Sequence, residues 1–322
     1  MENGKPLLEI SDLRIAFDME EGTIVPVDGV SLKFRKGETL CLVGESGCGK
    51  SLTSLAIMGL IPSPPGRISG GSIRLNGTNL LGLTEKEMES MRGNEIAMIF
   101  QEPMTSLNPV FTVGDQVTEP ILQHRKVGRK EAWSQALELL VKVGISSPED
   151  RIHRYPHELS GGMKQRVMIA MALSCNPKFL IADEPTTALD VTIQAQILDL
   201  LHKLQEDAHM GILLVTHNLG VVAEIGDHVA VMYAGKIVEE ADVRSLLKNP
   251  KHPYTIGLLE SVPKPGRKDR LTPIEGTVPD PSNFPKGCRF STRCKHVMDH
   301  CHSSEPPLKE VEKGHAAACW LY

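Results

Sequence analysis

Hydrophobic residues change their spacing along the chain in a pattern that predicts alternating strands and helices. Near the N-terminus, segments such as LLEISDLRIAF and GVSLKF alternate apolar with polar positions, which is typical of strands that bury one face. The runs FLIADE and GILLVTH start with continuous apolar residues, as in strands of a parallel sheet that is covered on both faces. The segment between these two runs repeats apolar residues at helical spacing. The pattern therefore predicts an α/β fold.

Local turn and helix signals add detail to this prediction. Asn76-Gly77 and Ala234-Gly235 each lie between strand-like segments, and such dipeptides favour hairpin turns. The segment RKEAWSQALELLVKVG repeats apolar residues at helical spacing, and we expect the helix to end at Gly144 because glycine is the usual residue just past a helix C-terminus.

The composition of the chain changes near residue 250. Residues from about 105 to 172 are mostly helical in pattern, within a longer segment that alternates strands and helices. After Asn249, prolines, glycines and turn residues dominate the sequence. We therefore predict a first domain over residues 1–250, with a helical subdomain at about 105–172, and a small irregular extension over residues 251–322.

Bulk properties exclude several classes of function. The 322 residues are 41% hydrophobic with a net charge of −5, so the chain can bury a core but has no general basic character for binding nucleic acid. The N-terminal MENGKPLLEI does not resemble a secretory signal, and no run approaches the roughly 18 apolar residues of a membrane span. We expect a cytosolic setting, in which clustered cysteines hold metal more often than they form disulfides.

The segment GESGCGKS, Gly44–Ser51, lies between a predicted strand and a predicted helix and matches the phosphate-binding pattern G-x-x-x-x-G-K-[ST]. Its glycines let backbone N–H groups converge on an anion at a helix N-terminus. We expect Lys50 to reach the β- and γ-phosphates and the Ser51 hydroxyl to bind Mg²⁺. The candidate ATP-binding residues here are Gly44, Glu45, Ser46, Gly47, Cys48, Gly49, Lys50, Ser51 and Leu52.

A pair of acidic residues supplies the second element that Mg²⁺ binding and phosphate hydrolysis need. In FLIADEP, four apolar residues precede Asp183 and Glu184, which would therefore lie at the carboxyl end of a buried strand, where ligands of parallel sheets collect. We expect Asp183 to hold Mg²⁺ and Glu184 to polarise the attacking water. Adjacent carboxylates are also common in solvated turns, but this position in a chain with a phosphate-binding loop favours the catalytic interpretation.

The segment LSGGM, Leu159–Met163, followed by KQRVMIAMAL, indicates which kind of P-loop protein this is. With it the sequence resembles the ATP-binding subunits of ABC transporters. Further motifs occur in the order typical of that family: Gln101 after the apolar IAMIF, the acidic pair, TALD ending in Asp190, and His217 in LLVTHN. Each motif is short, but six in order over more than half of the chain are hard to attribute to chance.

The resemblance implies the fold of an ABC cassette, with a RecA-like P-loop core, an antiparallel β-subdomain and a helical subdomain that carries the signature. Ser160, Gly161 and Gly162 form a second glycine turn before a helix, and such a turn can present backbone N–H groups to phosphate. In the family, this turn, with Gln165, completes the ATP site of a partner subunit.

Further roles also follow from the resemblance. Gln101 is expected to contact Mg²⁺ or the lytic water, and His217 to contact the γ-phosphate. Asp190 would link the two ATP sites across the interface. Family members stack an aromatic residue on adenine, for which Phe17 is the candidate, although Phe17 is equally compatible with packing inside the sheet.

Other P-loop classes fit less well. A GTPase should show an N-K-x-D element, which the sequence lacks, and small-molecule kinases lack the signature turn. A soluble ABC ATPase that acts on nucleic acid is the nearer alternative. Such proteins usually carry two cassettes, coiled-coil insertions or basic stretches, and this sequence shows none of them.

The resemblance continues past the cassette. HPYTIGLLESVP, followed by EGTVPDPSNFPKGCRFSTRC, resembles the C-terminal extension of oligopeptide and dipeptide importer ATPases. The subgroup also serves metal complexes and saccharides, so peptides are the expected cargo and those solutes are the alternatives. The resemblance further implies a second, homologous ATPase subunit, two transmembrane permease subunits, an extracytoplasmic substrate-binding protein, and a peripheral location on the cytoplasmic face of the membrane.

Four of the seven cysteines lie in this extension, namely Cys288, Cys294, Cys301 and Cys319. Four thiolates suit either Zn²⁺ or an iron–sulfur cluster. The absence of a C-x₂₋₄-C pair disfavours zinc, although a mixed Cys/His site stays open because histidines are nearby: His296, His300, His302 and His315. Related importer ATPases hold a [4Fe-4S] cluster in this segment, which the resemblance implies here. Unligated cysteines are the remaining alternative, but the segment has too few apolar residues to order itself.

Overall fold

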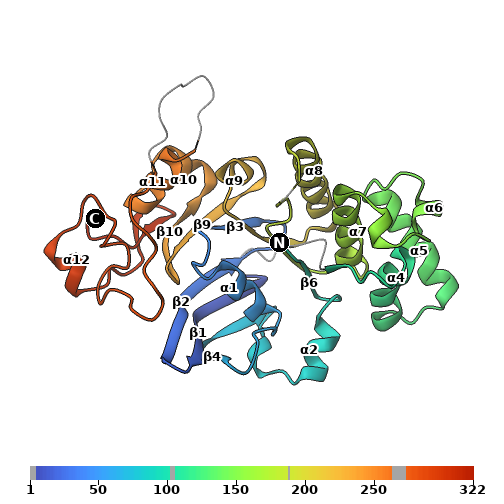
Figure 1. Ribbon diagram of the computed structural model, residues 1–322, viewed down its shortest axis with the longest axis horizontal. Helices are drawn as coiled ribbons and strands as arrows, with labels where there is room; N and C mark the ends of the chain where they lie inside the picture. Colours follow the sequence, from blue (N-terminus) through green and yellow to red (C-terminus); the bar gives the residue numbers. More distant parts are fainter. Residues whose placement is uncertain (1–4, 102–105, 188, 263–272) are drawn as a thin grey trace. The chain divides into compact units, whose positions relative to one another are not determined.

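The computed structural model describes residues 5–101, 106–187, 189–262 and 273–322 (Figure 1). The chain forms two compact units, which are described separately below. The first unit comprises Gly82–Leu214, Arg35–Glu38 and the N-terminal residues up to Leu7; the second comprises Leu8–Phe34, Thr39–Leu81 and Val215–Tyr322.

The second unit contains an antiparallel sheet with the strand order β2-β1-β4-β5. Its elements are β1 (Leu8–Met19), β2 (Gly22–Phe34), β4 (Gly66–Leu75) and β5 (Thr78–Asn79), followed by the short helix η1 (Leu80–Gly82). Asn76 and Gly77 both have positive φ, 48° and 87°, which is the geometry of a two-residue hairpin turn that matches the twist of its strands. The predicted hairpin is thus confirmed.

A second sheet of the same unit has the strand order β11-β12-β10-β9-β3. Its strands are β3 (Thr39–Val43), β9 (His228–Tyr233), β10 (Lys236–Asp242), β11 (Lys309–Glu312) and β12 (His315–Ala317). β3 runs parallel to β9, and β9 turns into β10 through Ala234 and Gly235, as predicted. Because Glu239 of β10 pairs with Ala317 of β12, the C-terminal extension adds strands to this sheet.

Helices complete the second unit: α1 (Lys50–Ile57), α9 (Leu219–Ile225), α10 (Val243–Lys248), α11 (Pro253–Glu260) and α12 (Asp299–Ser303). All five residues of β3 are buried, and the segment after it leads directly into α1. In Figure 1 the red C-terminal segment lies beside β10 and α11. The predicted domain boundary near residue 250 rests on composition, and the division into compact units does not test it.

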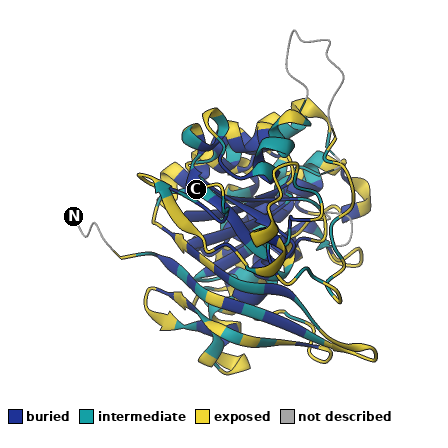
Figure 2. Ribbon diagram, turned by 90° about the vertical axis from the view of Figure 1, so that its left-hand side faces the viewer, coloured by how far each residue is buried: buried dark blue, intermediate teal, exposed yellow. Residues whose placement is uncertain are grey.

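Three strands of the first unit lie in the order β8-β7-β6, and β6 runs parallel to β7. The strands are β6 (Ile96–Ile99), β7 (Phe179–Asp183) and β8 (Gly211–Thr216), of which the last two residues of β8 belong to the second unit. Every residue of β7 and β8 is buried, as their continuous apolar sequences predict. Buried residues are coloured dark blue in Figure 2.

The helices of the first unit are α2 (Glu85–Met91), α4 (Val113–His124), α5 (Arg129–Lys142), α6 (Pro148–Arg151), η2 (Pro156–Glu158), α7 (Gly161–Leu173) and α8 (Val191–Ala208). α4, α5 and α7 pack together, in green in Figure 1. Gly144 follows α5 with φ of 75°, which confirms the predicted end of that helix. Within the described part of residues 105–172 the regular elements are helices. No described helix is long and apolar enough to cross a bilayer.

Candidate nucleotide-binding and catalytic site

The P-loop, Gly44–Ser51, joins β3 to α1 and packs closely against β9. A Cβ atom on Gly44 would lie 2.1 Å from the carbonyl oxygen of Met232, which is closer than any side chain can approach. Gly49, the residue before α1, has φ of 108°, and a Cβ there would lie 2.7 Å from the methyl group of Met232. Both positions therefore need glycine, for the close approach and for the left-handed backbone.

Lys50 is held inside this loop. Its side chain is buried, and Nζ donates hydrogen bonds to the carbonyl oxygens of Gly44 at 2.8 Å and Glu45 at 3.0 Å. The ammonium group therefore lies within the curve of the loop, where the sequence predicts phosphate. Ser51 is exposed at the start of α1, as a Mg²⁺ ligand must be, and so are Ser46 and Gly47.

Cys48 faces away from solvent. Its side chain is buried, and burial raises the pKa of its thiol. The side chain of Cys48 therefore packs inside the protein, so Cys48 would contribute to phosphate binding only through its backbone. Leu52, on the first turn of α1, is half-buried.

The acidic pair lies at the carboxyl end of β7, as predicted. Asp183 is the last residue of the strand and is buried, whereas Glu184 is half-buried and has φ of 47°, a conformation that is costly outside glycine. Gln101 donates a hydrogen bond from Nε2 to the Glu184 carboxylate at 3.0 Å, and Thr187 donates one from Oγ1 to the same oxygen at 2.9 Å. Two residues predicted from separate motifs, Gln101 and Glu184, thus meet in the first unit.

The signature turn lies at the start of α7. Ser160 is the residue before this helix and accepts a long hydrogen bond, 3.4 Å, from the N–H of Met163. Ser160 and Gly161 are exposed, so their backbone groups are accessible, and Gly162 is half-buried. Gln165, in contrast, is 1% exposed, so its side chain lies inside the unit.

Asp190 lies beside this turn. A Cβ on Gly162 would come within 3.0 Å of Ile193 on α8, and Asp190 caps α8 by accepting a hydrogen bond of 2.9 Å from the N–H of Ile193. The cap leaves Asp190 exposed. Asp190 and the signature turn therefore both lie next to Ile193 at the start of α8.

His217 and Phe17 lie in the second unit. His217 directly follows β8 and is exposed, and the next residue, Asn218, caps α9 by accepting a hydrogen bond from Gly220. Phe17 is half-buried on β1, where its ring covers the Cα of Gly66 on the neighbouring β4. Stacking on adenine and packing on the sheet remain alternatives for Phe17.

The predicted site residues thus fall into two groups. The second unit carries the P-loop, His217 and Phe17, and the first unit carries Gln101, Asp183, Glu184, the signature and Asp190. The arrangement of the two groups around one nucleotide stays a prediction. Thr187 was not predicted, because one hydroxyl in the run EPTTALD has no distinguishing spacing.

Comparison with known protein families identifies the class of P-loop protein to which this chain belongs. Residues 27–187 match the model of the ABC transporter family, and residues 238–301 match the oligopeptide/dipeptide transporter C-terminal region. Over 317 residues the chain is 54% identical to the oligopeptide transport ATP-binding protein AppD of Bacillus subtilis, covering 98% of this chain and 97% of that protein.

The chain belongs to the ABC transporter ATP-binding proteins of the oligopeptide/dipeptide importer type. It is also 49% identical to the dipeptide transport ATP-binding protein DppD of Bacillus subtilis, over 98% of this chain and 94% of that protein. Among solved structures, the dimeric bacterial ABC transporter cassette MJ0796 superimposes with a TM-score of 0.66 at 29% identity, over 74% of this chain and 99% of the cassette. The predicted ABC cassette fold and ATPase class are therefore confirmed.

The extension of this importer-type ATPase gathers its four cysteines around one small cavity, of about 10 Å³. Burial raises the pKa of Cys288 to about 11, and the other three cysteines contribute in the same direction. His296 lines the cavity too, but His315 is bound to Glu239 at 2.7 Å and His300 packs on Trp320. Across the described residues, no group of three or more Cys, His, Asp or Glu side chains is arranged to hold a metal ion.

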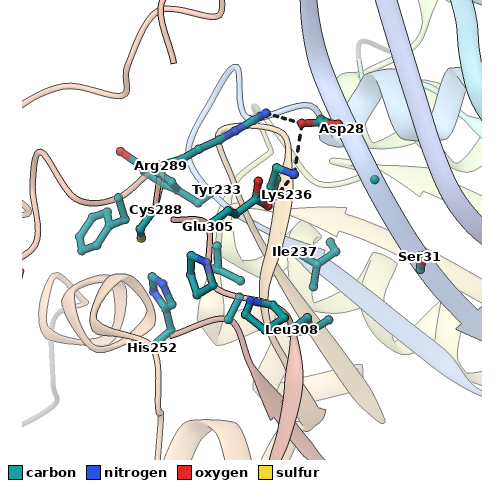
Figure 3. A pocket seen from close by; sticks show the side chains of 16 residues that line it. Asp28, Ser31, Tyr233, Lys236, Ile237, His252, Cys288, Arg289, Glu305 and Leu308 are labelled. Carbon is teal, nitrogen blue, oxygen red and sulfur yellow. Dashed lines mark hydrogen bonds and ion pairs between the residues drawn. The ribbon is translucent and has the colours of Figure 1, made fainter. Parts of the chain in front are cut away.

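A network of ion pairs fixes the extension to β2 and β10 (Figure 3). Asp28 of β2 binds Arg289 of the extension at 2.6 Å and Lys236 of β10 at 3.1 Å, and Lys236 also binds Glu305 at 2.6 Å. Burial by itself raises the pKa of Asp28, but the charges of Lys236 and Arg289 outweigh it, so the pKa of Asp28 lies below its ordinary value. The extension is therefore an integral part of the second unit.

Proposed function

We propose that the chain is the ATP-hydrolysing subunit of an importer that takes up oligopeptides or dipeptides. The observation that carries the proposal is the P-loop with its buried Lys50, in a chain that matches both the cassette family and the importer-specific C-terminal region. The named substrates of the relatives, oligopeptides for AppD and dipeptides for DppD, support peptides over metal complexes, saccharides or nucleic acid. Residues 1–250 are then the cassette, and residues 251–322 the extension.

Catalysis would rest on positioning and charge neutralisation. The N–H groups of the P-loop and Lys50 bind the β- and γ-phosphates, and Ser51, Gln101 and Asp183 are the candidate ligands of Mg²⁺. When bound, Mg²⁺ neutralises charge on these phosphates. Glu184 accepts a proton from the attacking water, and its hydrogen bonds with Gln101 and Thr187 hold the carboxylate in one orientation for that task.

Two cassettes would share each ATP. The turn of Ser160, Gly161 and Gly162, of which the first two residues are exposed, donates N–H groups to the phosphates bound by a partner, and the buried Gln165 belongs to the same motif. His217 contacts the γ-phosphate, Asp190 connects the two sites, and Phe17 stacks on adenine. The dimeric state of the similar MJ0796 cassette supports this arrangement.

We infer the partners from the importer family. They are a second, homologous ATPase subunit, two transmembrane permease subunits and an extracytoplasmic substrate-binding protein. The chain would then work as a peripheral subunit on the cytoplasmic face of the membrane. Nucleic acid is not among the partners that we infer.

We also propose that Cys288, Cys294, Cys301 and Cys319 hold a [4Fe-4S] cluster with a structural role. All four thiols border one cavity, and four soft donors suit iron–sulfur or zinc. A single Zn²⁺ would need all four sulfurs within about 2.3 Å of one point. Zn²⁺ on the same four thiolates is the alternative.

Uptake of labelled peptides by cells tests the proposed function. Replacing the native gene with Lys50→Ala should abolish uptake, because the phosphates lose their buried ammonium partner. Lys203→Ala is the matched control, since Lys203 is exposed on α8 and pairs only locally with Asp199. Uptake that persists in Lys50→Ala cells lacking any other peptide importer would refute the proposal.

Metal analysis after purification without oxygen tests the cluster. The intact chain should carry about four iron and four sulfide ions, and Cys301→Ser should lose most of them. Cys175→Ser is the control, because this buried thiol belongs to the first unit. One equivalent of zinc without iron would establish the alternative metal.

A further inference from the structure

The second residue of the P-loop is bound by an arginine from the cysteine-bearing segment. Arg293 Nη1 lies 2.8 Å from Oε2 of Glu45, and Nη2 lies 3.2 Å from Oε1, so the two side chains form a bidentate ion pair. The Arg293 side chain is 4% exposed. The Glu45 side chain is 27% exposed, so the pair is partly shielded from water, and its bidentate geometry makes it stronger than an open surface pair.

The remaining donors of Arg293 are also satisfied. Its Nε donates to the carbonyl oxygen of Glu275 at 2.9 Å, and Nη2 also donates to that of Ile274 at 3.2 Å. The guanidinium lies 5.8 Å from the ring centre of the buried Tyr233. These contacts leave the arginine little freedom, so it imposes a position on the Glu45 carboxylate.

A second contact from the same region reaches the backbone of the loop. The hydroxyl of Tyr254, on α11, accepts a hydrogen bond of 2.8 Å from the N–H of Glu45. Tyr254 is fully buried and packs against Tyr233 and Phe290, with ring centres 4.6 and 5.5 Å away. Glu45 is therefore fixed at both its side chain and its backbone by residues outside the P-loop.

The segment that carries Arg293 is a series of tight turns between two cysteines. Ser291 N–H donates to the carbonyl oxygen of Cys288 at 2.9 Å, and Arg293 N–H donates to that of Phe290 at 3.0 Å. Cys294 follows Arg293 directly. The position of the guanidinium thus depends on the order of the loop from Cys288 to Cys294.

The charge of Glu45 explains why its ion pair with Arg293 matters for ATP binding. Glu45 places a carboxylate within a loop that must bind a triphosphate, and an unpaired carboxylate would repel it. We propose that Arg293 is a positioning residue of the ATP site, which neutralises Glu45 and holds it away from the phosphates. The C-terminal extension, through its cysteine-bearing loop, thereby sets the affinity of the cassette for ATP. This inference rests on the proposed binding of ATP at the P-loop.

ATP affinity of the intact chain, measured with a fluorescent ATP analogue, tests this. Arg293→Ala should weaken binding about tenfold, as expected for the loss of one charge-assisted hydrogen-bonded pair. Arg293→Lys should restore part of the affinity, since it keeps the charge without the bidentate geometry. Glu45→Gln combined with Arg293→Ala should bind ATP more tightly than Arg293→Ala alone, because the repelling carboxylate is gone.

Arg289→Ala is the matched control for damage to the loop. Arg289 lies on the same segment and is similarly buried, but it pairs with Asp28. Its loss should change ATP affinity much less than the loss of Arg293. Equal affinity of Arg293→Ala and the wild type, or no relief from Glu45→Gln, would overturn the inference. Wild-type protein that bound no ATP would instead refute the proposed function.

Discussion

The side-chain amide of Gln101 donates a hydrogen bond of 3.0 Å to the carboxylate of Glu184. The two residues are 83 positions apart in the sequence, and each follows a strand of the same parallel pair, β6 and β7. Parallel strands bring their carboxyl ends to one edge, which is why the two side chains meet. The contact connects a residue that is expected to touch Mg²⁺ with the residue that is expected to activate water.

Removing the amide should slow hydrolysis more than it weakens binding. Gln101→Ala leaves the Glu184 carboxylate with the hydroxyl of Thr187, so its orientation becomes less fixed and kcat should fall about tenfold or more. Steady-state ATPase assays of the assembled importer measure kcat and KM separately. Gln135→Ala should change neither, because Gln135 is a half-buried residue of α5 that binds Glu131 on the same helix. A rise in KM alone for Gln101→Ala would contradict the positioning role.

Ser160 should matter for catalysis more than for stability. Its capping hydrogen bond to α7 is long, so Ser160→Ala should cost well under about 1 kcal/mol of unfolding free energy. ATPase activity of the assembled importer should nevertheless fall, because the exposed turn serves the partner's ATP.

Thr112→Ala should lower stability more than activity, which is the opposite of the result expected for Ser160→Ala. Thr112 forms a reciprocal capping box with Asp115 at the start of α4, and losing it should cost about 1 kcal/mol. Activity of the folded protein should be retained, because Thr112 is outside the predicted site. Equal activity losses for Ser160→Ala and Thr112→Ala would show that Ser160 acts only through folding.

Asp28 should stabilise the second unit in a pH-dependent way. Because its pKa is lower in the folded chain than the ordinary 3.8, the ionised form favours folding. This stabilisation is present above about pH 4 and is lost as pH falls through the lowered pKa. The difference in unfolding free energy between wild type and Asp28→Asn should therefore shrink as pH decreases from 7 towards 3.

Urea unfolding at a series of pH values measures this difference. Asp207→Asn is the control, since Asp207 is exposed and its nearest cation, Lys142, lies 3.8 Å away. It should change stability little at any pH. A constant difference for Asp28→Asn across the whole range would contradict the ion-pair explanation.

The parts of this structure that the sequence predicts well are those specified by neighbouring residues. The Asn76-Gly77 turn follows from the backbone freedom of two residues, and the P-loop follows from glycines that lie within six positions of one another. The buried strands β7 and β8 follow from continuous apolar runs. In each case, residues that are close together in the sequence are sufficient to specify the local structure.

Contacts between distant segments could not be predicted in this way. Arg293 and Glu45 are 248 positions apart, and neither belongs to a pattern that indicates a partner. Tyr254 belongs to a segment that the sequence predicts to be irregular, yet it is fully buried and binds the P-loop. The burial of Gln165 likewise depends on how α7 packs against α4, α5 and β6, which its motif does not encode.

ATP hydrolysis by a Glu184→Gln variant tests the central claim most directly. The amide cannot accept a proton from water, so the variant in the assembled importer should keep its ATP affinity while kcat falls about 100-fold or more. ATP should then hold two cassettes together, which size-exclusion chromatography would detect. Glu206→Gln, an exposed change on α8, should hydrolyse ATP like the wild type. Hydrolysis by Glu184→Gln at the wild-type rate would contradict the assignment of the catalytic base.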